Sequence, residues 1–266
     1  MSQSRWGSAV QTQQDNIVTI TFNRPEMRNA MDLDTWIALG RELPTLAARD
    51  DVAAIVFTGA GTEAFAAGAD IREFPERRMG SEQGRVYQEA VLAAIDAVLD
   101  CPKPTVAKIR GACVGGGLEL ASCCDLRVAA DNARFGIPIA RIGVLLGWRE
   151  MQRLVQLVGP GITLDLLLTA RLLDSEEALR VGLITHRVPG AELDAYTDRL
   201  LEAILAGSPF VHRAHKRMLN ILLSNPTLQS LSEEEEALPL SCFDSDDYKE
   251  GIDAFVNKRR PRFKGS

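Results

Sequence analysis

Hydrophobic residues in the first two-thirds of the chain fall into short runs that alternate with longer stretches of helical spacing. The segments Asn16–Phe22, Val52–Phe57, Thr105–Ile109 and Leu126–Ala129 are apolar or alternating. Glycine, proline or polar turn residues bound most of them, which predicts strands. Strands separated by helical segments are typical of an α/β fold.

Helices are predicted between these strands, one of them a short helix after a turn at Gly111–Gly117, and the last third of the chain is predicted to be almost entirely helical. Asp32 or Asp34 is a suitable cap for a helix that runs to about Ala48, and a second helix runs from Ser81 to Leu99. Helical spacing then dominates from Arg149 onward. We therefore expect a core over residues 1–200 and a helical region over residues 201–266.

Composition excludes several classes of protein. An apolar fraction of 46% in 266 residues is enough for a packed interior. The net charge of −6 argues against binding nucleic acid through phosphate neutralisation. No apolar run approaches the roughly 20 residues that span a bilayer, and the N-terminal residues resemble no signal or transit peptide. We expect a cytoplasmic protein with no membrane or nucleic-acid partner.

Metal and catalytic-triad chemistry are disfavoured by the same sequence. The five cysteines form no CxxC pair, and the three histidines are His186, His212 and His215. Structural and catalytic metal sites draw on spaced sets of these residues. No G-x-S-x-G nucleophile motif is present. We expect no metal site.

Two glycine-rich turns follow predicted strands. Gly68 lies in the first turn, and Gly115–Gly117 forms the second. Backbone without side chains can bring N–H groups close to a ligand, and two such turns can direct one N–H each at a common point, as in an oxyanion hole. Alternatively, these glycines only form tight turns. The second turn lacks a G-x-G-x-x-G arrangement, so nucleotide binding is disfavoured.

Glu119 lies two residues after the second glycine turn, between apolar neighbours on the first turn of a predicted helix. The helix N-terminus stabilises a carboxylate, whereas burial raises its pKa. This combination is typical of an acid or base beside a polarised carbonyl. The alternative is a carboxylate that caps the helix and pairs with Arg127 or Arg141.

Several motifs, taken in their order along the chain, resemble those of the crotonase superfamily, and in particular of its enoyl-CoA hydratase/isomerase members. The matching segments span nearly the whole chain and are Asn23–Ala30, Phe65–Ile71, Gly111–Asp125, Phe243–Gly251 and Phe255–Phe263. The resemblance implies a crotonase (ClpP-like) spiral of ββα units with a C-terminal helical trimerisation region. It also implies a homo-oligomer, either a trimer or a hexamer.

The resemblance further implies an acyl-CoA thioester as substrate and no separate cofactor. By position, the N–H groups of Ala69 and Gly116 would hold the thioester oxygen, and Glu119 would be the catalytic acid or base. The positions that the resemblance assigns to substrate and CoA binding are Arg28, Ala30, Ala67, Asp70, Ile71, Gly147, Phe255 and Lys258. The last two match positions that reach the CoA of a neighbouring subunit.

One departure from the resemblance concerns the acyl pocket. Hydratases carry a second glutamate after a Phe-Gly-x-Pro signature, but here Ile139 follows that signature. Trp148 is bulky and is expected to reshape the acyl pocket together with Ile139. Glu150, or less favourably Asp70, would have to supply a substitute acid from another loop.

We therefore expect an enzyme that hydrates a 2-enoyl-CoA reversibly through an enolate held in an oxyanion hole. Because a single base is sufficient for a proton shift, other enolate reactions stay open: isomerisation, decarboxylation or C–C cleavage. A third alternative is a non-catalytic acyl-CoA-binding protein.

Overall fold

The computed structural model describes residues 3–266 and divides the chain into two compact units. The first unit comprises the chain through Cys101 and residues Thr105–Thr197, and the second comprises Pro102–Pro104 and Asp198–Ser266. The boundary expected after residue 200 lies within helix α7 (Leu193–Leu205), which crosses from one unit to the other.

A seven-stranded sheet forms the base of the first unit. Its strands, in spatial order, are β1 (Gln3–Trp6), β2 (Ala9–Gln14), β3 (Ile17–Phe22), β4 (Ala54–Gly59), β6 (Thr105–Ile109), β8 (Leu126–Ala130) and β11 (His186–Val188). The first three strands pair antiparallel, and the pairs from β3 to β11 are parallel. Parallel strands need crossover connections, which the helices supply.

The strands of a second sheet, four in number and short, alternate along the chain with the later strands of the first. Its order is β10 (Leu173–Asp174), β9 (Arg134–Gly136), β7 (Ala112–Val114) and β5 (Ala64–Ala66). Along the chain, β4 is followed by β5, β6 by β7 and β8 by β9, so successive turns each add one strand to each sheet. This is a spiral of ββα units, and the predicted α/β class is confirmed.

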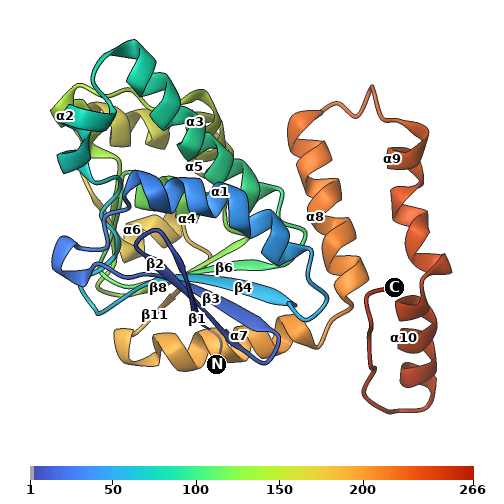
Figure 1. The fold of residues 1–266 in the computed structure, drawn as a ribbon. Coiled ribbons are helices and arrows are strands. Elements are labelled where there is room, and N and C mark those ends of the chain that lie inside the picture. Colours follow the sequence, from blue (N-terminus) through green and yellow to red (C-terminus); the bar gives the residue numbers. More distant parts are fainter. Residues whose placement is uncertain (1–2) are drawn as a thin grey trace. The chain divides into compact units, whose positions relative to one another are not determined.

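Four longer helices complete the turns of the spiral: α1 (Leu33–Ala47), α3 (Gly80–Leu99), α4 (Gly116–Cys123) and α5 (Trp148–Thr169). Helix α1 begins at Asp32, whose side chain accepts a hydrogen bond from the Thr35 N–H, as capping residues do. Helices α1 and α3 lie over the same face of the large sheet (Figure 1). The side chains of Trp36 and Tyr87 from these two helices are fully buried.

Shorter elements connect these helices and strands. They are η1 (Pro25–Met27), η2 (Ile71–Glu73), α2 (Phe74–Arg77), η3 (Pro138–Ile142), α6 (Ser175–Arg180) and η4 (Gly190–Glu192). Helix α6 begins at Asp174, whose side chain accepts from the Glu177 N–H. The η2, α2 and η3 segments each contribute residues to the lining of one cavity.

The second unit is helical, as the periodicity predicts for the last third of the chain. It contains α8 (Pro209–Ser224), α9 (Glu233–Ala237), η5 (Leu238–Asp244) and α10 (Asp246–Val256). Ser232 and Glu235 form a capping box at the start of α9. Over residues 3–266, no helix combines the length and the apolar character that crossing a bilayer requires.

Candidate active site

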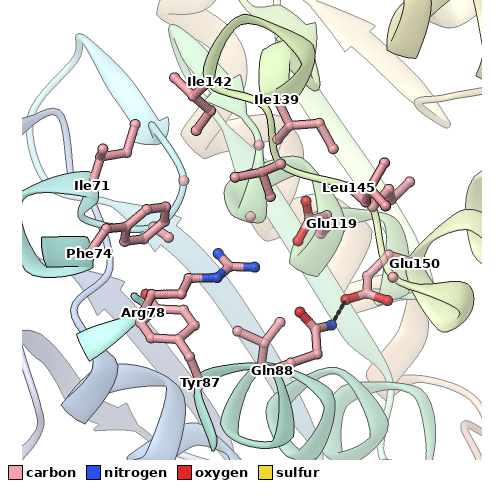
Figure 2. A pocket seen from close by; sticks show the side chains of 18 of the residues that line it. Ile71, Phe74, Arg78, Tyr87, Gln88, Glu119, Ile139, Ile142, Leu145 and Glu150 are labelled. Atoms are coloured by element: carbon pink, nitrogen blue, oxygen red, sulfur yellow. Dashed lines mark hydrogen bonds between the residues drawn. The ribbon is translucent and has the colours of Figure 1, made fainter. Parts of the chain in front are cut away.

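A cavity with a volume of about 240 Å³ lies in the first unit, at the N-terminus of helix α4. Five parts of the chain line it: Trp36 of α1, residues 67–71, the α2–α3 segment, residues 114–119 and residues 138–150. Figure 2 shows the side chains of Glu119, Gln88 and Glu150 directed into this cavity, with aliphatic side chains around them. Polar groups that converge in an otherwise apolar cavity are typical of an active site.

The two glycine turns meet at the wall of the cavity. Gly115 has φ +54° and Gly68 has φ +99°, backbone conformations that glycine adopts without strain. A methyl group built on Gly116 would lie 3.5 Å from the backbone nitrogen of Ala69. The turns expected from sequence to act together therefore lie side by side.

Hydrogen bonds on either side hold both turns in place. The Met31 N–H donates to Gly68 O at 2.8 Å, and the Asp70 N–H donates to Met31 O at 2.9 Å. On the other turn, the Gly115 N–H donates to Gly136 O at 2.8 Å. None of these bonds uses the N–H of Ala69 or Gly116. A pair of fixed amide donors at one cavity wall is the arrangement that stabilises a developing oxyanion.

Glu119 projects from the first turn of α4 into the cavity (Figure 2). Protein surrounds the carboxyl group on the sides away from the cavity, and this desolvation raises its pKa to about 8. The negative charge of Glu150 raises the pKa further, while the positive charge of Arg78 opposes the shift. Glu119 is therefore protonated at neutral pH and close to its titration midpoint.

The two arginines considered as structural partners for Glu119 have other roles. The buried guanidinium of Arg127 donates to Leu183 O at 2.7 Å and to Cys124 O at 2.5 Å. Arg141 donates to Ala170 O at 2.8 Å. The interpretation of Glu119 as one half of an ion pair with either arginine is therefore not supported.

Glu150 is a second carboxyl group in the same cavity, contributed by the first turn of α5. Its side chain is 2% exposed. Oε1 accepts a hydrogen bond from Gln88 Nε2 at 2.7 Å, whereas the buried Oε2 has no hydrogen-bond partner among residues 3–266. A methyl group on Gly147 would lie 2.3 Å from Oε2, so glycine at this position leaves space for the carboxyl group.

Arg78 is the cation that faces these carboxyl groups (Figure 2). Its guanidinium carbon lies 4.9 Å from the ring centroids of both Phe74 and Tyr87, within cation–π range. Sequence analysis did not identify Arg78 or Gln88 as site residues. Neither residue belongs to a motif, and both reach the cavity only because the α2–α3 segment folds over α4.

Several residues predicted to bind substrate do line the cavity. They are Ala67, Ile71, Ile139 and Gly147. Ile139 lies in η3 on the same cavity as Glu119, and Ile142 and Leu145 extend the apolar wall (Figure 2).

Asp70 lies outside this lining and forms ion pairs. Its carboxylate accepts from Arg72 Nη2 at 2.7 Å and from Arg24 Nη2 at 2.9 Å. These arginines hold the pKa of Asp70 well below its usual range, Arg72 having the larger effect. A carboxylate held in this way is a poor substitute for a proton-transferring acid, so the structure disfavours that alternative for Asp70.

Three other predicted site residues, Arg28, Ala30 and Trp148, lie away from the cavity lining. Arg28 is exposed, and its carbonyl accepts from the Ala67 N–H at 3.0 Å, which connects the Arg28–Ala30 loop to the first glycine turn. Trp148, expected in the acyl pocket, is 88% exposed. It lines a second, apolar hollow together with Ile139 and Leu145.

Phe255 and Lys258 belong to the second unit. Phe255 is 85% exposed, and Lys258 follows α10 with φ +51°. The neighbouring Arg259 is neutralised within its own chain, because its Nη1 lies 2.6 Å from Glu250 Oε1 and its Nη2 lies 2.5 Å from Asp253 Oδ2. Lys258 therefore has more freedom than Arg259 to contact a phosphate.

Comparison with known proteins identifies the family. Residues 12–266 match the model of the enoyl-CoA hydratase/isomerase family. The chain is 33% identical to the short-chain-enoyl-CoA hydratase of Clostridium acetobutylicum over 92% of each protein. It is 34% identical to the crotonyl-CoA hydratase of Syntrophomonas wolfei, over 94% of this chain and 95% of that protein.

A solved structure agrees with this relationship. The enoyl-CoA hydratase/carnithine racemase from Magnetospirillum magneticum superimposes with a TM-score of 0.94 and 38% identity, over 99% of this chain and 97% of that one. The protein described here belongs to the enoyl-CoA hydratase/isomerase family of the crotonase superfamily, as its motifs predict.

Proposed function

We propose that this protein is an enoyl-CoA hydratase that adds water reversibly to the double bond of a 2-enoyl-CoA. The observation that carries the proposal is the position of Glu119, a carboxyl group with a pKa of about 8, in one cavity with the adjacent amides of Ala69 and Gly116. The hydratase names of the related proteins support the same reaction.

The chemistry follows from these groups. The thioester oxygen accepts hydrogen bonds from the N–H groups of Ala69 and Gly116. As the water oxygen bonds to Cβ and gives up one proton to a base, the electron pair of the double bond moves toward the thioester oxygen, and the two amides stabilise the resulting enolate. Glu119, protonated at neutral pH, then gives its proton to Cα.

The cavity walls favour an apolar acyl group. Ile71, Ile139 and Leu145 contribute aliphatic side chains to its lining. Dehydration is the same route in reverse: ionised Glu119 removes the Cα proton of a 3-hydroxyacyl-CoA. The reaction needs no metal or organic cofactor in addition to the thioester.

We also propose that the chain forms a homo-oligomer in the cytoplasm, either a trimer or a hexamer. The apolar hollow around Trp148 supports this proposal, because Leu145 and Leu168 on its rim are 90% and 76% exposed. Apolar surface of this kind on a single chain is typical of protein interfaces. Light scattering on the purified protein measures the assembly.

Turnover of crotonyl-CoA tests the proposed reaction. We expect loss of the enoyl absorbance with the wild-type protein and a decrease in kcat of about 10²–10⁴-fold in Glu119→Gln, the usual contribution of a general acid–base group. Because the substitution is isosteric, acyl-CoA binding should persist. Full turnover by Glu119→Gln would remove this residue from the mechanism.

A further inference from the structure

We propose that Glu150 is the second catalytic carboxylate of this enzyme, the base that accepts a proton from the attacking water. This proposal rests on the proposed hydratase function and names a group which that function requires. Ile139 cannot transfer a proton, although it occupies the position where the family resemblance places the second glutamate.

The placement of the Glu150 side chain supports this role. It reaches the cavity from α5, a different element from the one that carries Glu119, and it is 2% exposed. Gln88 occupies Oε1, which leaves Oε2 buried and without a partner among the described residues. A buried carboxylate oxygen without a hydrogen bond is costly, and a substrate water would satisfy it.

Gln88 holds the carboxylate in this orientation, and Gly147 leaves space for it. Gln88 donates to Oε1 from α3, which fixes the rotation of the carboxyl group. Gly147, at the N-cap of α5, has φ −69°, a value open to any residue, so its backbone does not require glycine. A side chain there would collide with Oε2 and with Gln88 Nε2. Gly147 and Gln88 are therefore positioning residues.

The proton balance of the reaction is complete with two carboxyl groups. Oε2 of Glu150 takes one proton from water as the oxygen bonds to Cβ, and Glu119 gives its proton to Cα. The product gains one molecule of water. Glu119 is then ionised and Glu150 protonated, and one proton returns from Glu150 to Glu119 directly or through solvent before the next turnover.

Two reactions separate the roles of the two carboxyl groups. Hydration of crotonyl-CoA needs both groups. Exchange of the Cα proton of butyryl-CoA with D₂O needs only ionised Glu119 and the oxyanion hole, because butyryl-CoA has no double bond and no β-hydroxyl group. We expect Glu150→Gln to lower hydration about 10²–10⁴-fold and to retain exchange, whereas Glu119→Gln should lose both activities.

The pH profile of exchange provides an independent readout. Exchange requires Glu119 as a carboxylate, so the rate rises with pH through the pKa of about 8. Among the described residues, the charges that shift this pKa are Glu150, which raises it, and Arg78, which lowers it. Glu150→Gln removes the first, so the midpoint should move to lower pH. Such a shift would show that Glu150 stands beside Glu119 as a carboxylate, while loss of hydration with retained exchange shows that its role belongs to the step that uses water.

The outcomes distinguish this proposal from the function on which it rests. Wild-type hydration with an unchanged rate in Glu150→Gln overturns the role of Glu150 alone. Loss of hydration and exchange together in folded Glu150→Gln also overturns it, because Glu150 would then support the whole site. A wild-type protein that exchanges the proton of butyryl-CoA but hydrates no enoyl-CoA refutes the proposed function itself.

A second variant covers the case in which Glu150→Gln does not fold. Glu150→Ala leaves a space beside Gln88 that a small carboxylate can enter. We expect added formate to restore part of the hydration rate, with sodium chloride at equal ionic strength as the control. Matching rates in formate and in chloride would contradict a proton-transfer role at this position.

Discussion

Glu119→Gln should make the protein more stable at neutral and alkaline pH while it removes activity. The wild-type carboxyl group has a pKa of about 8 in the folded protein, whereas an unperturbed glutamate has a pKa of 4.5. Folding therefore favours the protonated form. Below about pH 4.5 the group is protonated in both the folded and the unfolded chain, so the free energy of unfolding is at its highest with respect to this group. That stability is lost as the pH rises through 8.

The size of the effect follows from the shift. Each pKa unit corresponds to about 1.4 kcal/mol, so the cost of burying this titratable group reaches about 3 kcal/mol at pH 7, where Glu119 must take up a proton on folding, and about 5 kcal/mol above pH 9, where it is ionised in the folded protein, both as upper bounds. A glutamine at this position does not ionise. The variant should match the wild type near pH 4 and exceed its free energy of unfolding progressively as the pH rises.

Urea unfolding at pH 4.5, 7 and 9, at one fixed protein concentration, measures this difference. Glu76→Gln is a suitable control, because Glu76 is exposed and lies outside the cavity. We expect the difference in the free energy of unfolding between Glu119→Gln and wild type to increase with pH. The corresponding difference for Glu76→Gln should stay constant. If the difference in the free energy of unfolding between Glu119→Gln and wild type did not change with pH, the claim that desolvation raises the pKa of this carboxyl group would be refuted.

Three further substitutions test other parts of the account. Gly116→Ala places a methyl group 2.8 Å from the Trp36 ring and should lower kcat for crotonyl-CoA by about 10²–10³-fold, with the melting temperature measured to separate misfolding from a displaced amide. Arg78→Met removes a cation that lowers the pKa of Glu119, so the midpoint of butyryl-CoA exchange should move to higher pH; a shift to lower pH would reverse the assigned sign. Lys258→Ala should raise KM for CoA esters with little change in kcat, and the loss should shrink for substrates without the 3′-phosphate. Equal losses for both substrates would place Lys258 away from that phosphate.

The parts of the fold that sequence predicts best are those with strong local signals. Thr105–Ile109 is a strand with the bounds expected, because Pro104 and Gly111 enclose a short apolar run. Helix α1 begins after Asp32, one of the two caps expected from the sequence. In both cases, residues close in sequence determine the structure.

The second sheet shows what local patterns miss. Strands β5, β7 and β9 have three residues each, too few for periodicity to reveal. They are strands because turns of the spiral that are distant in sequence pair with one another. Strand β2 is also absent from the prediction, since Gln11, Thr12 and Gln13 make it too polar.

The candidate site divides in the same way. The glycine turns and Glu119 stand out because the residue types and their spacing suit the chemistry. The packing of α3 and α5 at the N-terminus of α4 brings Gln88 and Arg78 to the cavity and buries Glu150. No short sequence motif predicts that packing. Arg259 shows that a charged residue in the sequence need not be available to a ligand, because its charge is neutralised by Glu250 and Asp253 of its own chain.

The most direct test of the central claim is the fate of water oxygen in the reaction with crotonyl-CoA. The protein is incubated with crotonyl-CoA in water enriched in ¹⁸O, and the product is analysed by mass spectrometry after fragmentation of the acyl group. A hydratase that uses Glu119 and the two amides should yield 3-hydroxybutyryl-CoA with ¹⁸O on Cβ, and Glu119→Gln should yield almost none. An acyl-CoA product with the mass of the substrate, or crotonyl-CoA recovered intact, would contradict the account.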